Sequence, residues 1–145
     1  MKILLQRVKE ASVSVDGVVI GAIGAGLLAF LGVSESDTPD KVLKMVEKVA
    51  KLRIFEDEHG KINRSITDTN GEILIISQFT LYADTSRGHR PSFPNAAPPQ
   101  LARSIYDHFI ISCQGRFAKV AEGEFGAMMD VSLVNDGPFT IMLES

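Results

Sequence analysis

The first third of the chain alternates apolar and polar positions in a way that predicts β-strands joined by tight turns. Within residues 2–15, apolar side chains occupy alternate positions in the same phase on either side of a polar centre. This pattern predicts a long strand or a bent pair of strands. The dipeptide Asp16-Gly17 is a two-residue hairpin signal, and residues 18–20 form the returning strand. Residues 27–33 are apolar enough to predict a strand that is buried on both faces.

Apolar residues at three- and four-residue spacing predict two helices. The first begins at Thr38-Pro39, because threonine is a favoured N-cap and proline suits the first helical position. Its predicted buried stripe consists of Val42, Met45, Val46, Val49 and Leu52. The second helix follows Pro99 and ends at Gly115. One face of this second helix carries Leu101, Ile105 and Phe109.

The second half of the chain contains further strands and a long loop. Residues 73–82 are rich in β-branched and aromatic side chains and predict one strand, which a proline-rich loop at 84–99 follows. Two last strands, at 128–134 and 139–143, are joined by a predicted turn at 135–138. Strand pairs joined by tight turns predict an α/β protein of the α+β type, with a mostly antiparallel sheet and two main helices packed on it.

The composition is that of a single globular domain covering residues 1–145. No linker or repeat divides the chain, and 145 residues with 45% apolar side chains can bury a core without a disulfide or metal. Glycines interrupt the longest apolar run, at 18–33, so we expect strands there and no membrane segment. The N-terminus does not resemble a signal peptide, and the single cysteine, Cys113, excludes an intrachain disulfide. The expected location is the cytoplasm.

Common catalytic and cofactor motifs are missing from the sequence. The glycines at positions 21, 24 and 26 precede a predicted strand, so they indicate a bend and no phosphate-binding loop. None of His59, His89 and His108 is spaced from another ligand as zinc sites require, and we expect neither a metal nor a cofactor. Cys113 lies in the second predicted helix, where a buried and unreactive thiol is expected.

The end of the strand predicted at 73–82 is the first candidate site. Its apolar run continues into the polar residues Ser77, Gln78 and Thr80. Polar groups at the end of a buried strand must find partners. These side chains therefore either cap the strand and satisfy the following loop, or contact a ligand.

The following loop is the second candidate site. It carries Arg87, His89 and Arg90 within four residues, with Phe93 nearby. Arginine next to small hydroxyl residues suits a phosphate or a ribose, and an aromatic ring can stack on a base. The alternative is a basic loop that contacts only solvent.

The third candidate is the segment Asn135–Thr140, which contains Gly137-Pro138. A turn between two strands is the simplest interpretation. However, the cis form of a peptide bond before proline costs only about 0.5–1 kcal/mol. A cis bond at this position would present two carbonyl oxygens on one side as a rigid acceptor pair.

Three segments together resemble the D-aminoacyl-tRNA deacylase family: SQFTLYAD at 77–84, RGHRPSF at 87–93 and NDGPFT at 135–140. The opening MKILLQRVKEASVSVDG is also similar, so the resemblance covers essentially the whole chain. His89 and Phe139 depart from the asparagine and valine expected in the family. The resemblance implies a barrel-like sheet, a homodimer, and hydrolysis of the ester that joins a D-amino acid, or mischarged glycine, to the tRNA 3′ end.

The resemblance also implies roles for the candidate residues. The catalytic residues would be Ser77, Gln78, Phe79 and Thr80. Met129 would line the adenine site, and Gly137 and Pro138 of the opposite subunit would exclude L-aminoacyl side chains by steric clash. Such a wall would not exclude glycine, which has no side chain. Arg87 and Arg90 would contact the aminoacylated 3′ end of the tRNA.

Two mechanisms fit these residues. Thr80 can attack the ester as a nucleophile, although no base lies beside it in the sequence. Alternatively, the backbone N–H groups of Phe79 and Thr80 stabilise the oxyanion while the 2′-hydroxyl of the substrate helps to activate water. The resemblance supports the second mechanism. The alternative to an enzyme is a dimeric module that only binds a nucleotide or peptide.

The charge of the chain limits the size of an RNA contact. The net charge is -3 at pH 7, which argues against a protein covered by phosphate contacts. The charge is uneven, because residues 41–53 contain five basic side chains and one acid, Glu47. A protein that holds tRNA by its 3′ end neutralises few phosphates, so the predicted salt dependence of binding is shallow.

Overall fold

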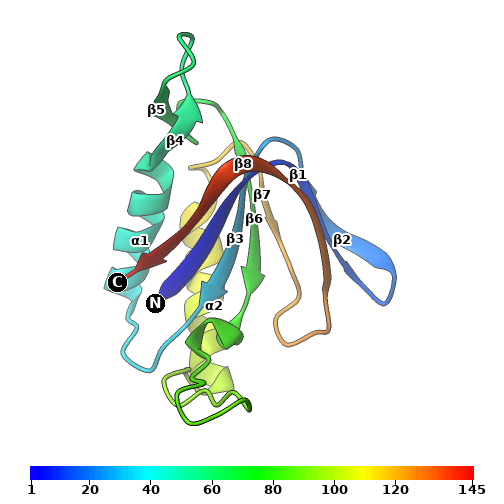
Figure 1. Cartoon of the computed structure of the whole chain (residues 1–145), viewed down its shortest axis with the longest axis vertical. Helices are drawn as coiled ribbons and strands as arrows, with labels where there is room; N and C mark the ends of the chain where they lie inside the picture. Colours follow the sequence, from blue (N-terminus) through cyan, green and yellow to red (C-terminus); the bar gives the residue numbers. More distant parts are fainter.

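The fold is built around the long strand β1 (Lys2–Val15), in a computed structural model that describes residues 1–145 (Figure 1). The first half of β1 pairs antiparallel with β3 (Gly26–Gly32), and its second half pairs antiparallel with β2 (Val18–Ile23). Along its other edge, β1 pairs antiparallel with β8 (Asp130–Glu144) over most of its length. Three strands thus depend on β1 for their place in the sheet.

The sheet continues from β3 to β6 (Glu72–Ser77) and then to β7 (Val120–Glu122), and both of these pairings are parallel. Parallel neighbours need long crossover connections. These connections contain α1 (Pro39–Lys51), between β3 and β6, and α2 (Pro99–Cys113), between β6 and β7. The sheet is therefore mixed and curls into a nearly closed barrel (Figure 1), so the prediction of a mostly antiparallel sheet is right only for the strands around β1.

The two helices pack against each other and cover one face of the sheet. The Thr38 hydroxyl caps α1 by accepting a hydrogen bond from the Lys41 N–H at 3.4 Å, as the sequence predicts. Four members of the predicted stripe are buried, and Leu52, the C-cap of α1, is half-buried. On α2, Ile105 and Phe109 are buried, whereas Leu101 is half-buried.

Apolar side chains fill both faces of the sheet. The larger cluster lies between the sheet and the helices and includes Leu27, Ala29 and Leu31 of β3. The smaller cluster includes Leu28 of β3 and Leu74 of β6. Successive residues of a strand face opposite sides, so these two clusters confirm that the strand predicted at 27–33 is buried on both faces.

The strand predicted at 73–82 is wrong in its second half. β6 ends at Ser77, and Phe79–Tyr82 forms a short 3-10 helix, η1. The last residue of β6 pairs with Leu31, and β3 ends one residue later at Gly32. A Cβ placed on Gly32 would lie 3.2 Å from the Cβ of Leu81. The chain therefore folds back over the end of β3, where no partner strand remains.

The turn predicted at 135–138 is also wrong, because β8 is one strand that runs through it. Gln6 of β1 pairs with Thr140, and Val8 pairs with Asn135, so β8 has more residues than β1 over this stretch. The extra residues bulge out of the ladder. They include Gly137 and Pro138, and the bond between the two is cis.

A small hairpin of β4 (Arg53–Glu56) and β5 (Ile62–Ser65) follows α1. The turn of this hairpin contains His59-Gly60, and the sequence analysis does not predict the flanking strands. None of the helices is both long and apolar enough to cross a membrane.

Candidate functional site

A largely apolar cavity of about 710 Å³ opens at the end of β6. Its walls come from the end of β6, the start of η1, segment 93–99, the first turn of α2 and segment 125–131. The predicted site residues that line it are Ser77, Gln78, Phe79 and Met129. The fold thus brings together residues that are up to 52 positions apart in the sequence.

The transition from β6 to η1 leaves two backbone donors free, one on a residue that lines this cavity and one on the next residue. The Gln78 N–H still continues the sheet, because it donates to the Leu31 carbonyl at 2.8 Å. The first N–H groups of a helical turn have no acceptor within the turn. The N–H groups of Phe79 and Thr80 are in this position, and neither donates a hydrogen bond within the protein. Two adjacent free donors can stabilise an oxyanion.

The side chains around these donors are only loosely held. The Ser77 side chain is half-buried and its hydroxyl makes no hydrogen bond within the protein. The Gln78 amide donates to the Thr80 hydroxyl, which is exposed and does not line the cavity. Thr80 therefore contacts the site through Gln78, and no titratable group is bonded to its hydroxyl.

Phe79 provides an exposed aromatic surface beside the cavity. Its side chain is 56% exposed although it is large and apolar. One edge packs against Phe93, with ring centroids 4.9 Å apart and planes inclined by 66°. Such an edge-to-face pair fixes the ring while leaving a face free. A nucleobase can stack on this free face.

Met129 is held against the cavity by a network that starts on α2. The Tyr106 hydroxyl donates to the Ile75 carbonyl at 2.9 Å and to the Gly123 carbonyl at 3.4 Å. Burial raises the pKa of this hydroxyl well above its ordinary value. A Cβ on Gly123 would lie 2.6 Å from the sulfur of Met129, so only glycine lets Met129 approach this closely. Nothing in the sequence pattern singled out Tyr106 or Gly123.

Replacing Tyr106 with phenylalanine is expected to lower the free energy of unfolding by about 1–2 kcal/mol, because the Gly123 carbonyl loses its buried donor and the Ile75 carbonyl keeps only the Gly123 N–H. Urea unfolding followed by circular dichroism measures this change. The matched control is Tyr82→Phe, because the Tyr82 ring is only half-buried and a smaller loss is expected. Equal losses in the two variants would contradict the role of the Tyr106 hydroxyl.

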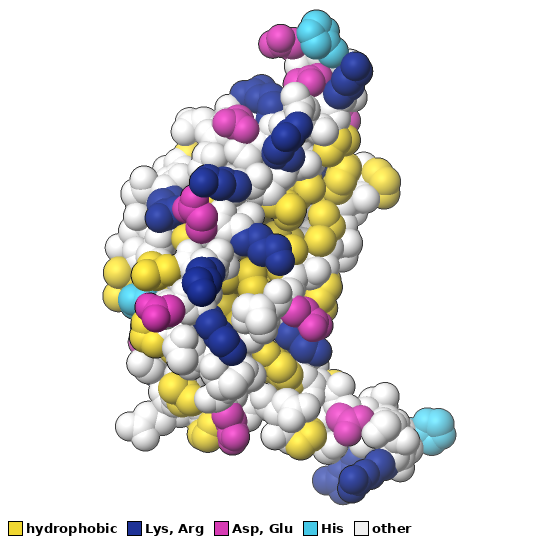
Figure 2. Space-filling view, turned by 90° about the vertical axis from the view of Figure 1, so that its left-hand side faces the viewer, with side chains coloured by type: hydrophobic (Ala, Val, Ile, Leu, Met, Phe, Trp, Pro, Cys, Tyr) yellow, Lys and Arg dark blue, Asp and Glu magenta, His cyan; other side chains and the backbone are white.

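The predicted loop residues Arg87 and Arg90 lie outside the cavity. They are exposed on an arm that Asp84 and Ser92 close with two backbone hydrogen bonds of 2.7 and 3.0 Å. The Ser86 N–H donates to the Asp84 carboxylate, which holds the pKa of that carboxyl below its usual value. Figure 2 shows basic side chains gathered on a projection at the lower end of the molecule. The arm joins the site through Phe93, which lines the cavity.

Gly137 and Pro138 also lie outside the cavity of their own chain. Both are exposed, on the bulge of β8. The buried side chain of Arg7 supports this bulge: its Nε donates to the Asp136 carbonyl at 3.0 Å, and its guanidinium lies 4.3 Å from the centre of the Phe139 ring. Sequence reasoning missed Arg7, because it lies among other polar residues at the centre of β1. A single chain therefore does not bring the Gly-Pro pair to the other site residues.

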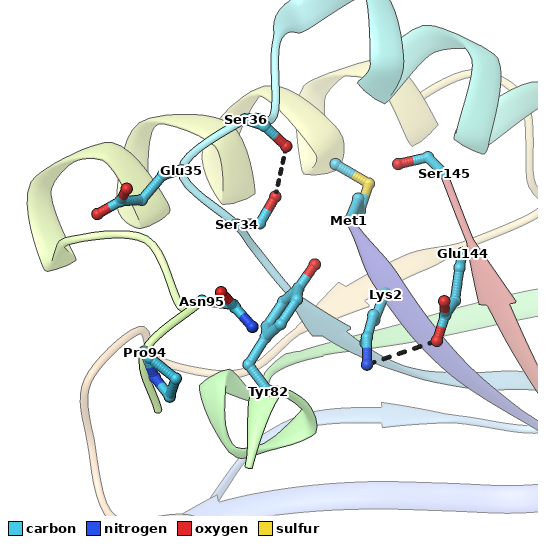
Figure 3. A pocket seen from close by; sticks show the side chains of 10 residues that line it. All are labelled: Met1, Lys2, Ser34, Glu35, Ser36, Tyr82, Pro94, Asn95, Glu144 and Ser145. Carbon is cyan, nitrogen blue, oxygen red and sulfur yellow. Dashed lines mark hydrogen bonds and ion pairs between the residues drawn. The ribbon is translucent and has the colours of Figure 1, made fainter. Parts of the chain in front are cut away.

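A second cavity, of about 400 Å³, is polar and lies between the chain ends and η1 (Figure 3). Lys2 forms an ion pair of 3.5 Å with Glu144 and lies 5.1 Å from the centre of the Tyr82 ring. Glu35 also lines this cavity. The acidic side chains make it a poorer place for a phosphate than the apolar cavity beside it.

The side chains that the sequence excludes as catalytic lie elsewhere. Cys113 is buried on α2, and burial raises the pKa of its thiol to about 12, so the thiol is unreactive as expected. His59 is exposed on the hairpin turn. His108 is half-buried on α2, and its Nε2 is enclosed without a partner. None of the three lines the apolar cavity.

Known proteins with the same sequence pattern identify the family. The profile of the D-Tyr-tRNA(Tyr) deacylase family matches residues 4–144. This chain belongs to that family. Proteins named D-aminoacyl-tRNA deacylase from Roseiflexus castenholzii and Thermosipho africanus are 56% and 50% identical over 145 residues. Both matches include 100% of this chain, and they cover 92% and 97% of those proteins.

Two solved structures share the fold of this chain. A structure titled c-Myc DNA Unwinding Element Binding Protein has a TM-score of 0.94 and 43% identity, and the match covers 100% of this chain and 99% of that one. A probable eukaryotic D-amino acid tRNA deacylase has a TM-score of 0.85 at 17% identity, over 98% and 97% of the two chains, which shows the shared fold alone. The family and hydrolase class expected from the sequence are therefore confirmed.

Proposed function

We propose that this chain hydrolyses the ester between a D-aminoacyl group and the 3′-terminal adenosine of tRNA, releasing the free amino acid and tRNA. The observation that carries the proposal is the pair of free N–H groups on Phe79, which lines an apolar cavity, and on Thr80, the next residue. Membership of the deacylase family supports it. Because aminoacyl-tRNA is a cytoplasmic substrate, the cytoplasm is the proposed location.

In this mechanism water is the nucleophile. The 2′-hydroxyl of the terminal ribose helps to activate the water, which attacks the ester carbonyl carbon. The N–H groups of Phe79 and Thr80 stabilise the negative charge that develops on the carbonyl oxygen. The bond from this carbon to the ribose 3′-oxygen then breaks, and the proton lost by the water ends on that oxygen. Phe79 and Met129 hold the adenosine, while Ser77 and Gln78 position the ester.

Selection between D- and L-aminoacyl groups requires a second chain in this proposal. Gly137 and Pro138 are exposed and lie outside the cavity of their own chain, so they are free to enter that of a partner in a homodimer. Their backbone would occupy the space that an L side chain needs, and reject it by clash. Glycine has no side chain to clash with this backbone, so glycine mischarged on tRNA is a further expected substrate.

The direct test compares the hydrolysis of D-Tyr-tRNA and L-Tyr-tRNA by the purified protein. The proposal expects release of tyrosine from the D substrate and a rate close to the spontaneous one for the L substrate. Gly-tRNA serves as a third substrate and is expected to be hydrolysed. Binding of D-Tyr-tRNA without release of tyrosine would favour a module that only binds nucleic acid.

Replacing Thr80 with alanine is expected to leave the rate constant for D-Tyr-tRNA hydrolysis within about tenfold of the original, because no base activates this hydroxyl. Single-turnover measurements give that rate constant. Serine at the same position is the control, since it keeps the hydroxyl. Loss of activity in Thr80→Ala alone, with intact folding and tRNA binding, would show that Thr80 is the nucleophile.

A further inference from the structure

Four lysines lie along the outer face of α1 and are here called the α1 lysine strip: Lys41, Lys44, Lys48 and Lys51. Their spacing of three and four residues places them on one side of the helix. The last three are exposed, and the strip rises about 15 Å along the helix at 1.5 Å per residue. Figure 2 shows basic side chains running down the face that carries α1.

Few acids neutralise this strip. Lys51 and Arg116 both bind Glu47, and these contacts hold the pKa of that carboxyl below its ordinary value. Lys44 and Lys48 have no ion-pair partner in the protein. Like charges at this spacing repel each other. A chain with a net charge of -3 thus concentrates unpaired positive charge on one helix.

The strip starts beside the candidate site. Val33 lines the apolar cavity, and its carbonyl accepts a hydrogen bond of 2.9 Å from Ala97, which also lines it. The next residue, Ser34, forms a bridge to Ala96. α1 begins five residues later, at Pro39. The wall of the cavity therefore leads directly into the first turn of the helix that carries the strip.

We propose that the α1 lysine strip contacts phosphates of the double-stranded stem next to the 3′ end of the tRNA, while that end occupies the cavity. This inference rests on the proposed function. Lysine is a flexible point charge that binds phosphates without reading sequence. The strip then fixes the position of the stem, while the ester at the 3′ end of the tRNA is hydrolysed in the cavity.

The test removes the two unpaired charges with the double variant Lys44→Gln and Lys48→Gln. The matched control is Lys9→Gln with Lys119→Gln, which removes two exposed lysines elsewhere and changes the net charge equally. Dissociation constants for uncharged tRNA are measured over a range of salt concentrations. KM and kcat are measured with D-Tyr-tRNA and with the 3′-D-tyrosyl ester of a short CCA oligonucleotide.

The strip variant is expected to bind tRNA about tenfold more weakly, with a salt slope shallower by about 2, because two phosphate contacts are lost. Its KM should rise for D-Tyr-tRNA and stay unchanged for the short ester, and kcat should be unchanged for both. Equal effects in the control variant, equal effects on the short ester, or no effect on binding would each overturn the proposal. If the unaltered protein hydrolysed neither substrate, the proposed function would be wrong, while tRNA binding would still test the strip.

Discussion

Replacing Phe79 with proline is expected to lower the rate constant for D-Tyr-tRNA hydrolysis about 10²–10³-fold below that of Phe79→Ala, the loss typical of one oxyanion donor. Both variants lack the aromatic ring, and only proline also lacks the N–H. Proline suits this position because Phe79 is the first residue of η1 and makes no hydrogen bond through its N–H. Gln78, with φ -144° and ψ 80°, lies outside the helical region that a following proline disfavours.

Two measurements keep this comparison interpretable. The unfolding midpoints of the two variants in urea should agree. The Phe79 side chain is 56% exposed, and the N–H that proline removes makes no hydrogen bond within the protein. Their affinities for uncharged tRNA should also agree. Equal hydrolysis rates for the alanine and proline variants would mean that the Phe79 N–H does not stabilise the transition state, and the mechanism would need another donor.

Replacing Gly137 with alanine is expected to lower D-Tyr-tRNA hydrolysis about tenfold or more, because the added methyl group would overfill the cavity of the partner subunit. Within its own chain the new Cβ would meet only the side chain of Asn135, at 2.9 Å from Oδ1. The Asn135 amide donates to the carbonyls of Arg7 and Phe139, so moving it should lower the stability of the chain by about 1 kcal/mol at most. A loss of activity while the chain stays folded would therefore arise in the partner.

Mixing this variant with Phe79→Pro tests the shared site directly. In a mixed dimer, the intact cavity of the Gly137→Ala chain meets the intact Gly-Pro pair of the Phe79→Pro chain. One functional site per mixed dimer forms, so the mixture should be more active than either variant alone. A mixture no more active than the average of its components, despite subunit exchange, would place Gly137 and Pro138 outside the partner site.

The spacing of apolar residues within a segment predicted the helices and strands whose structure depends on that segment alone. α1 follows from its cap and apolar stripe, and β3 from its apolar run. The errors lie where a neighbour decides the structure. Residues 79–82 have the composition of a strand but lose their partner when β3 ends. Residues 135–138 look like a turn but belong to one continuous strand, because the residues on both sides of them pair with β1. Such effects are invisible to a pattern that reads one segment at a time.

The same distinction holds for the candidate site. The motif at 77–80 predicted three residues that line the cavity, and Met129 was predicted as well. Tyr106 and Arg7 escaped notice, because each acts through carbonyl groups of distant segments. Their side chains support backbone that forms or flanks the site, a role that spacing in the sequence does not record. The place of Gly137 and Pro138 in a partner subunit stays a prediction.

The pairing of the first strand with the last delays completion of the fold during synthesis. Lys2 pairs with Glu144, and Ser14 pairs with Asp130. While the ribosome is still adding residues 130–144, one edge of β1 has no strand beside it. An open edge is a template for association with other chains, and contacts so distant in sequence form slowly. A product released before Asp130 would keep this open edge permanently, which makes prematurely terminated chains candidates for aggregation and degradation.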